Sequence, residues 1–244
     1  MNIVLITAFG VGGATVLGAI VGFIFKKAAS LYSEYIMAIA AGIMLSASVF
    51  SLIIPSLERG GAYVTVLGML VGAVTIDLLD STADRICERI RFSADTDLGK
   101  SVFLLISAIA IHNLPEGIAA GVGFGSGDIG DALMIAGGIA LQNIPEGMIL
   151  IAPMMSAGLS PSKALLLASF TGVIEIFGTF LGYFAVSIAS LMLPFILSYA
   201  GGCMLYVILG EMLPASRLGE SSRISNYFFL IGFAFMIIFD ALIA

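Results

Sequence analysis

The sequence of 244 residues predicts an all-α integral membrane protein with eight transmembrane helices in an inverted-repeat 3+2+3 arrangement. Hydrophobic residues make up 60% of the chain, charged residues make up 11%, and the mean hydropathy is +1.14. These values lie outside the range of soluble globular proteins. Two further observations support the prediction: long apolar runs recur along the whole chain, and one polar motif occurs in two consecutive runs.

An α-helix needs about 20 residues to cross the roughly 30 Å hydrocarbon core of a bilayer. Eight apolar runs have that length: residues 3–25, 34–57, 62–79, 100–123, 130–154, 161–190, 194–214 and 225–243. The first run has neither the basic segment nor the cleavage site of a signal peptide, so we expect a retained helix. We therefore predict one transmembrane transporter domain over residues 1–244. Its one sizeable loop, at about 80–99, has alternating charges and is expected to be a solvated helix and linker.

The basic residues predict the orientation of the chain in the membrane. Nine of the ten Lys and Arg residues fall on one side of this topology, and Arg59 alone falls on the other. The side with more positive charge is usually cytoplasmic, so both termini are expected to be extracytoplasmic, in the cell membrane (inner or plasma membrane). The net charge of −6 gives no polybasic surface, which argues against a nucleic-acid partner. Cys87 and Cys203 have no CxxC spacing, so we expect neither a disulfide framework nor a thiolate metal site.

The repeated motif places ionisable side chains within two predicted spans. It reads His112-Asn-Leu-Pro-Glu116-Gly in the fourth span and Gln142-Asn-Ile-Pro-Glu146-Gly in the fifth. Residues four apart project from the same face of a helix. The proline bends the helix, and the glycine that follows the glutamate allows a neighbouring helix or an ion to approach closely. Because ionisable groups are costly in a membrane, the two motifs most simply line a transport pathway.

The chemistry of the motif favours a metal cation. Interhelical hydrogen bonds would explain a single buried amide, but two glutamates without a basic partner repel each other unless a cation lies between them. Imidazole, carboxylate and amide groups together suit borderline ions such as zinc. We also expect Glu175, a lone carboxylate in the sixth span, to be a metal ligand.

Two further spans offer residues of lower weight. Met44 in the second span would favour soft or borderline metals, although a membrane methionine usually only packs. Ser48 and Ser51 lie on the same span, among small residues, and are candidates for the pathway. Glu211, near the cytoplasmic end of the seventh span, either assists metal release or is simply solvated.

With both motifs in view, the whole chain resembles the ZIP (Zrt/Irt-like) family of metal transporters, closest to its short prokaryotic branch. The resemblance implies a binuclear metal centre in the middle of the membrane. It implies one metal at Met44, His112, Glu116, Gln142 and Glu146, and a second at Asn113, Asn143, Glu146 and Glu175, with Glu146 bridging. Some relatives have Asp or His where this chain has Asn143 or Gln142, which lowers the ligand charge here. The His-rich cytoplasmic loop of many eukaryotic members is missing.

A weaker repeat supports inverted symmetry. Gly42-Ile-Met-Leu, followed by Pro55, is similar to Gly202-Cys-Met-Leu, followed by Pro214. Spans 4 and 5 run in opposite directions and carry the same motif, as in transporters built from inverted repeats. We therefore expect spans 1–3 to mirror spans 6–8. Alternating access would follow if a metal-carrying group of helices slides against a scaffold, as is thought of ZIP relatives, which also form homodimers.

The sequence thus predicts transport of a divalent metal into the cytoplasm, with zinc as the first candidate and iron, manganese and cadmium as others. The metal would be the substrate, and we expect no resident cofactor and no enzymatic activity. One alternative is a proton-coupled carrier of a non-metal substrate, because buried glutamates can shuttle protons. A second is an intramembrane metallohydrolase, but His112 is the only histidine and stands in H-x-x-x-E spacing, without an HExxH helix.

Overall fold

The protein is helical throughout the part of the chain that the structure describes. This computed structural model describes residues 2–89, 97–127, 129–156, 159–188, 190–216 and 222–243, and contains no strand within those ranges. The α-helices are α1 (Asn2–Ile24), α2 (Lys26–Leu31), α3 (Ser33–Ala47), α4 (Ile54–Arg89), α5 (Asp97–Val122), α6 (Ile129–Ser156), α7 (Pro161–Ile188), α8 (Leu193–Val207), α9 (Leu213–Ala215) and α10 (Ser222–Ile243). The segments η1 (Ser48–Ile53) and η4 (Ile208–Met212) are π-helical, and η2 (Gly123–Ser126) and η3 (Ser190–Met192) are 3-10 turns. The prediction of an all-helical chain is confirmed.

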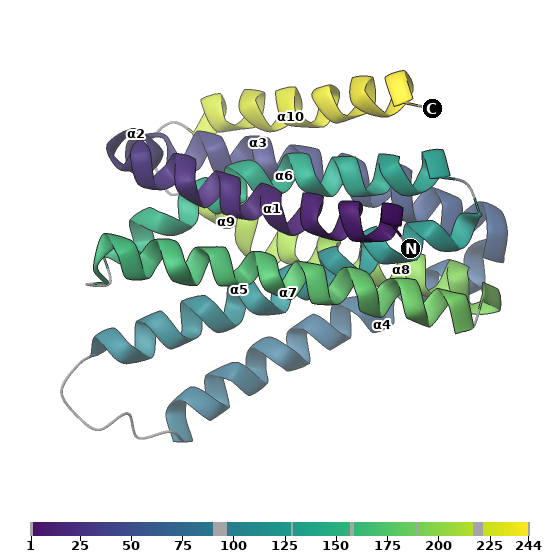
Figure 1. The fold of residues 1–244 in the computed structure, drawn as a ribbon, viewed down its shortest axis with the longest axis horizontal. Coiled ribbons are helices and arrows are strands. Elements are labelled where there is room, and N and C mark those ends of the chain that lie inside the picture. Colours follow the sequence, from purple (N-terminus) through teal and green to yellow (C-terminus); the bar gives the residue numbers. More distant parts are fainter. Residues whose placement is uncertain are drawn as a thin grey trace.

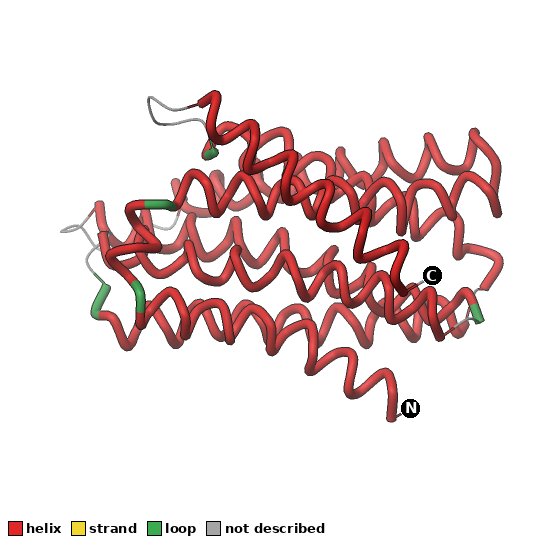
Figure 2. Tube along the Cα trace, turned by 90° about the horizontal axis from the view of Figure 1, so that it is seen from above, coloured by secondary structure: helices red, strands yellow, loops and turns green. Residues whose placement is uncertain are grey.

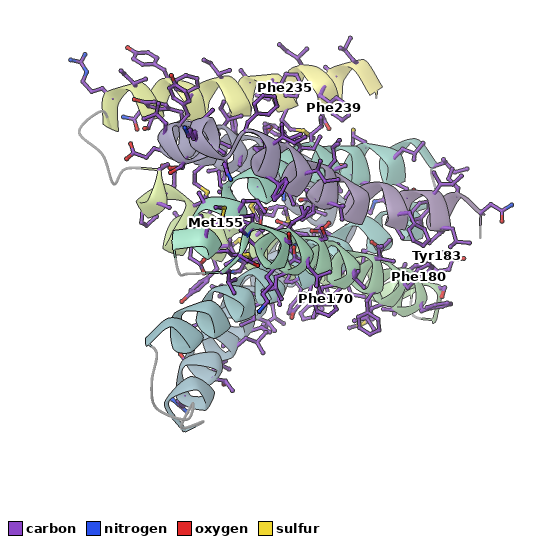
Figure 3. All side chains as sticks on the ribbon, turned by 60° about the vertical axis from the view of Figure 1, so that its left-hand side comes forward. Met155, Phe170, Phe180, Tyr183, Phe235 and Phe239 are labelled. Carbon is purple, nitrogen blue, oxygen red and sulfur yellow. The ribbon has the colours of Figure 1, made fainter. Side chains whose placement is uncertain are left out.

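Several helices are suited to a bilayer. Six stretches of the described chain are long and apolar enough to cross one: Asn2–Ile24, Ser33–Thr82, Ile129–Met155, Pro161–Ser187, Leu193–Ala215 and Arg223–Leu242. Their outer faces carry large apolar side chains, such as Phe170 on α7, which is 55% exposed and is labelled in Figure 3. Such a surface suits lipid rather than water. It is consistent with the membrane protein that composition predicts.

Both ends of the chain lie at the same end of the helix bundle. Figures 1 and 2 show the N- and C-termini together, and Figure 1 shows α2 and the first turns of α7 and α10 at the opposite end. Those three segments carry Lys26, Lys163 and Arg223. The far end of α4, which carries Arg85, lies there as well. Positive charge is therefore gathered at the end away from the termini.

The stretch Ser33–Thr82 is 50 residues long, and it folds back on itself at Gly61. Gly61 has φ 73° and ψ 172°, a backbone conformation that glycine adopts readily. The hydroxyl groups of Ser56 and Thr65 lie 3.0 Å apart, although nine residues of straight helix would separate them by about 13 Å. Beyond this reversal α4 continues to Arg89 and α5 begins at Asp97, so much of the expected loop at 80–99 is helical, and residues 90–96 lie outside the described chain.

The helices pack as two groups of four. We call α1, α5, α6 and α7 the motif group, because α5 and α6 carry the repeated motif, and we call α3, α4, α8 and α10 the flanking group. The most extensive packing pairs α5 with α7 and α1 with α6 in the motif group, and α4 with α8 and α3 with α10 in the flanking group. Within each group, glycines bring backbones into direct contact. A Cβ at Gly147 would lie 2.3 Å from the Thr15 carbonyl oxygen, and one at Gly72 would lie 2.1 Å from the Tyr199 carbonyl oxygen.

The two groups meet through side chains instead. A Cβ at Gly138 on α6 would approach the terminal methyl of Met236 on α10, and one at Gly137 would approach the ring of Phe239. Among the described glycines, none makes a close backbone contact from one group to the other. Close backbone contacts therefore hold each group together, whereas at Gly137 and Gly138 the two groups meet through side chains.

The two π-helical segments occupy matching places in the flanking group. Each begins four residues after a buried methionine, Met44 or Met204, and each is followed by a proline, Pro55 or Pro214. A proline leaves the carbonyl oxygen of the preceding turn without its usual donor, and a wider π turn accommodates this defect. The weak sequence repeat thus corresponds to a repeated local structure.

Glycine packing yields a test of this arrangement. Gly72→Ala forces a methyl group against the backbone of α8, so we expect the variant to lose about 1–3 kcal/mol of stability. Gly13→Ala is the matched control, because a Cβ there meets no atom within 4 Å. The control should be neutral or up to about 1 kcal/mol more stable, since alanine favours a helix over glycine. Thermal unfolding of both variants in detergent measures the difference, and equal unfolding temperatures would contradict the packing described.

Candidate metal centre

The repeated motifs bring a group of polar side chains into the interior between α5 and α6. Glu116, Gln142, Asn113 and Asn143 are at most 1% exposed, and His112 is 7% exposed. Glu146 is half-buried. Each motif has a proline within its helix, Pro115 in α5 or Pro145 in α6, and the helix continues through it.

Glu116 and Gln142 form the first contact between the motifs. Gln142 Nε2 donates a hydrogen bond of 2.7 Å to Glu116 Oε1. The other oxygen of each side chain, Glu116 Oε2 and Gln142 Oε1, has no hydrogen-bond partner among the described residues. Two ligand-type oxygens from adjacent helices are thus buried and unsatisfied.

Glu175 on α7 is the centre of a second contact. Its Oε1 accepts hydrogen bonds from Thr15 Oγ1, at 2.6 Å, and from Asn113 Nδ2, and its Oε2 accepts one from Asn143 Nδ2 at 2.6 Å. The backbone of α7 reaches this position because Gly117 follows Glu116: a Cβ at Gly117 would lie 2.3 Å from the Glu175 carbonyl oxygen. All four helices of the motif group therefore meet at this carboxylate.

His112 faces the flanking group. Its Nε2 lies 2.8 Å from Glu211 Oε1, close enough for an ion pair but without hydrogen-bond geometry. Ligand atoms of His112, Glu211 and Asp80 all lie within 4.8 Å of one another. Glu211 lies on η4 and is exposed, whereas Asp80 lies on α4 and is half-buried. The three side chains together could hold a metal ion where the two helix groups meet.

The residues expected on the second span differ in their surroundings. Met44 is 1% exposed and packs in the main hydrophobic core. Ser48 Oγ donates a hydrogen bond of 2.7 Å to the Met44 carbonyl, so its hydroxyl is occupied within the helix. Ser51 is buried and its hydroxyl has no partner among the described residues. Ser51 also lines a cavity at the end of the bundle that carries Arg59 and Asp131.

The unpartnered atoms point to the chemistry that the site can perform. Four buried oxygens lack partners within the described chain: Glu116 Oε2, Gln142 Oε1, Asn113 Oδ1 and Asn143 Oδ1. Leaving one such group unsatisfied costs about 1–3 kcal/mol, so an unpartnered cluster calls for an ion or water. Within the described residues, no Lys or Arg forms an ion pair with Glu116, Glu146 or Glu175. Carboxylate, amide and imidazole groups without a basic partner fit a divalent cation.

Two residues at the site were not predicted from the sequence: Thr15 and Asp80. Both positions could have been found from the weak sequence repeat in which Gly42 corresponds to Gly202, 160 residues later. The same separation of 160 residues links Thr15 to Glu175, and it also links Asp80 to Asp240. Extending the weak repeat along spans 1–3 would have drawn attention to both positions. The two cysteines take no part here, since Cys203 is a buried free thiol and the side chain of Cys87 lies outside the described part.

Comparison with known proteins places this site in a family context. The family model described as ZIP Zinc transporter matches residues 83–240. The zinc transporter ZIPB of Bordetella bronchiseptica is 30% identical, over 93% of this chain and 77% of its own length. The zinc transporter ZupT of Shigella dysenteriae is 27% identical, over 97% of this chain and 95% of its own length.

Other relatives match over only part of their length. The zinc transporter GufA of Myxococcus xanthus is 36% identical, over 57% of this chain and 55% of its own length. A relative from Arabidopsis thaliana is 30% identical over 93% of this chain, but the match covers only 36% of that protein. The chain therefore spans about half or less of the length of these two relatives.

If the buried polar cluster binds a divalent cation, zinc should stabilise the purified protein. At 100 times its dissociation constant a ligand adds about 2.7 kcal/mol to the free energy of unfolding. We expect zinc to raise the unfolding temperature of the unaltered protein and to have a much smaller effect on Glu116→Ala. Ser46→Ala is the control, because Ser46 is equally buried and lies outside the cluster. A zinc-induced shift that is the same in Glu116→Ala as in Ser46→Ala would contradict binding at this site.

Proposed function

We propose a function that proceeds from one established premise: the chain belongs to the ZIP family of zinc transporters. It is a multi-pass membrane protein, and we propose that it carries divalent metal ions into the cytoplasm. Zinc is the first candidate, and iron, manganese and cadmium are further candidates. The observation that carries the proposal is the set of buried, unpartnered oxygens that Glu116, Gln142, Asn113 and Asn143 present between α5 and α6.

The proposed ion site lies where the two motifs meet. Its side chains are those expected from the sequence: Met44, His112, Glu116, Gln142 and Glu146 around one position, and Asn113, Asn143, Glu146 and Glu175 around the other. The hydrogen bond from Gln142 to Glu116 supports this assignment, because it holds two of the ligands side by side. A metal bound there would supply the positive charge that the carboxylates lack.

Metal release would begin at His112. The cluster of His112, Glu211 and Asp80 lies beside the proposed site, and Glu211 is exposed. An ion leaving the centre could therefore exchange its ligands stepwise. His112 would remain bound to the ion during this exchange, because it belongs both to the centre and to the cluster with Glu211 and Asp80. This end of α4 continues to the basic end of the bundle, which the positive-inside tendency assigns to the cytoplasm, so we propose extracytoplasmic termini.

An exposed ion pair lies at the opposite end of the bundle. Arg59 Nη2 on α4 and Asp131 Oδ2 on α6 lie 3.1 Å apart, and both side chains are about 40% exposed. They line the cavity that also contains Ser51 and Glu58. An exposed ion pair contributes only about 0–1 kcal/mol, so it can break and re-form during a transport cycle. We propose that ions enter through this cavity when the pair opens.

The proposed mechanism is alternating access by an elevator-like movement. The motif group would move as one body against the flanking group, and the side-chain contacts between the groups support such sliding. The reversal at Gly61 is consistent with eight crossings. The matching π segments and the separation of 160 residues support a 3+2+3 inverted repeat. We further propose one transporter domain over residues 1–244, a homodimer, and no resident cofactor or enzymatic activity.

A liposome assay tests the proposed function. We expect purified protein in vesicles to take up zinc, and Glu116→Ala and His112→Ala to lose at least about 90% of the rate, because each removes a ligand that fixes the ion. Cys203→Ser is the control, since Cys203 is buried outside the proposed pathway. Zinc uptake at the unaltered rate in both alanine variants would contradict the proposal. Uptake of a non-metal substrate without bound metal would instead favour the proton-coupled carrier.

A reversible cross-link tests alternating access. In the double variant Arg59→Cys/Asp131→Cys, a short bifunctional thiol reagent should hold α4 and α6 together and stop zinc uptake. Reductant should restore it. Each single variant, Arg59→Cys or Asp131→Cys, treated in the same way, is the control for modification alone. Full zinc uptake by cross-linked protein would rule out movement between α4 and α6 as a step of transport.

A further inference from the structure

The carboxylate of Glu175 is held by three protein donors. Thr15, Asn113 and Asn143 each donate a hydrogen bond to it, and between them they engage both of its oxygens. Glu175, Thr15 and both asparagines are at most 1% exposed. Each of these contacts is a hydrogen bond to a buried carboxylate, so together they fix the position of the carboxylate between α1, α5 and α6.

The same contacts determine which ends of the two amides remain free. An asparagine side chain has one nitrogen donor and one oxygen acceptor. Because the nitrogens of Asn113 and Asn143 face Glu175, their oxygens are turned away from that carboxylate, and both oxygens are buried without a partner among the described residues. Gln142 shows the same pattern, since its nitrogen donates to Glu116 and its oxygen is unpartnered. In each case a carboxylate fixes the amide so that its oxygen is available to a cation.

Thr15 is the outermost member of this chain of contacts. Its hydroxyl lies 2.6 Å from Glu175 Oε1, and α1 comes close enough because Gly147 on α6 packs against the Thr15 carbonyl. Gly117 packs in the same way against the Glu175 carbonyl. Thr15 and Glu175 thus occupy matching places in the 160-residue repeat, one with a hydroxyl group and the other with a carboxylate.

We infer that Thr15 is a positioning residue for the transported metal, because it holds the carboxylate of Glu175 in place. Glu175 accepts the amide groups of Asn113 and Asn143 and thereby directs their oxygens to the ion. This inference rests on the proposed function and adds Thr15 to the residues that build the site. Outer carboxylates orient metal ligands in this way at many metal sites, and losing such a contact weakens metal affinity 10–100-fold, as a rough range.

Thr15→Val tests the inference, because it removes the hydroxyl while keeping the shape of the side chain. We expect the KM for zinc uptake into liposomes to rise about tenfold, with no decrease in the maximal rate per folded transporter. Thr15→Ser keeps the hydroxyl and should restore the KM to within about twofold of the unaltered value. A purely structural role would lower the maximal rate and leave the KM unchanged. Thr15→Ala gives the same comparison if the valine variant does not fold.

Two results would overturn the inference: an unchanged KM in both Thr15→Val and Thr15→Ala, or a serine variant as impaired as the valine variant. Zinc affinity of the purified proteins, measured by equilibrium dialysis, provides the same comparison without transport. If the unaltered protein binds zinc but does not carry it, the proposed function fails, and the order of affinities still decides the role of Thr15. Failure of the inference and failure of the proposed function are therefore distinguishable.

Discussion

The structure depends most on how it accommodates buried carboxylates. Glu116 and Glu175 have no accessible surface, and no lysine or arginine of the described chain pairs with them. In hydrocarbon such groups are stable only when hydrogen bonds or a cation compensate for the lost solvation. The chain uses three amides and one hydroxyl for the first purpose. The oxygens that those amides leave unpartnered are the reason to expect a cation.

Glycine contacts place these polar groups and also determine which parts of the molecule can move. Gly117 and Gly147, which follow the motif glutamates, bring α5 against α7 and α6 against α1. The site is therefore built within one tightly packed group of helices. At the edge of this group, His112 faces the flanking group, where its Nε2 lies 2.8 Å from Glu211 Oε1 and its ligand atom lies near that of Asp80. The proposed ion site thus lies within the motif group, and His112 connects it to the flanking group. This arrangement is consistent with transport by relative movement of the two groups as rigid bodies.

Much of this could be predicted from the sequence, because the signals were strong and local. Hydropathy identified an all-helical membrane protein, and the motif of His112 and Gln142 identified the two helices that carry the polar cluster. Other features depend on contacts between distant segments, which no local pattern encodes. The weak repeat pairs Thr15 with Glu175 in the sequence, but Thr15 carries no charge, and its hydrogen bond to Glu175 depends on the packing of α1 on α6 and α7. Asp80 begins the charged segment that was expected to be solvated, so its carboxylate was not singled out. In the structure this part of the segment continues α4 as a helix.

The central claim is that a transported metal ion binds between α5 and α6. Anomalous diffraction at the zinc edge, from crystals of the protein grown with zinc, tests it most directly. The account predicts a peak with Glu116 and His112 or Gln142 at bonding distances of about 2.0–2.2 Å. A strong peak elsewhere in the chain, with none between these two helices, would contradict it.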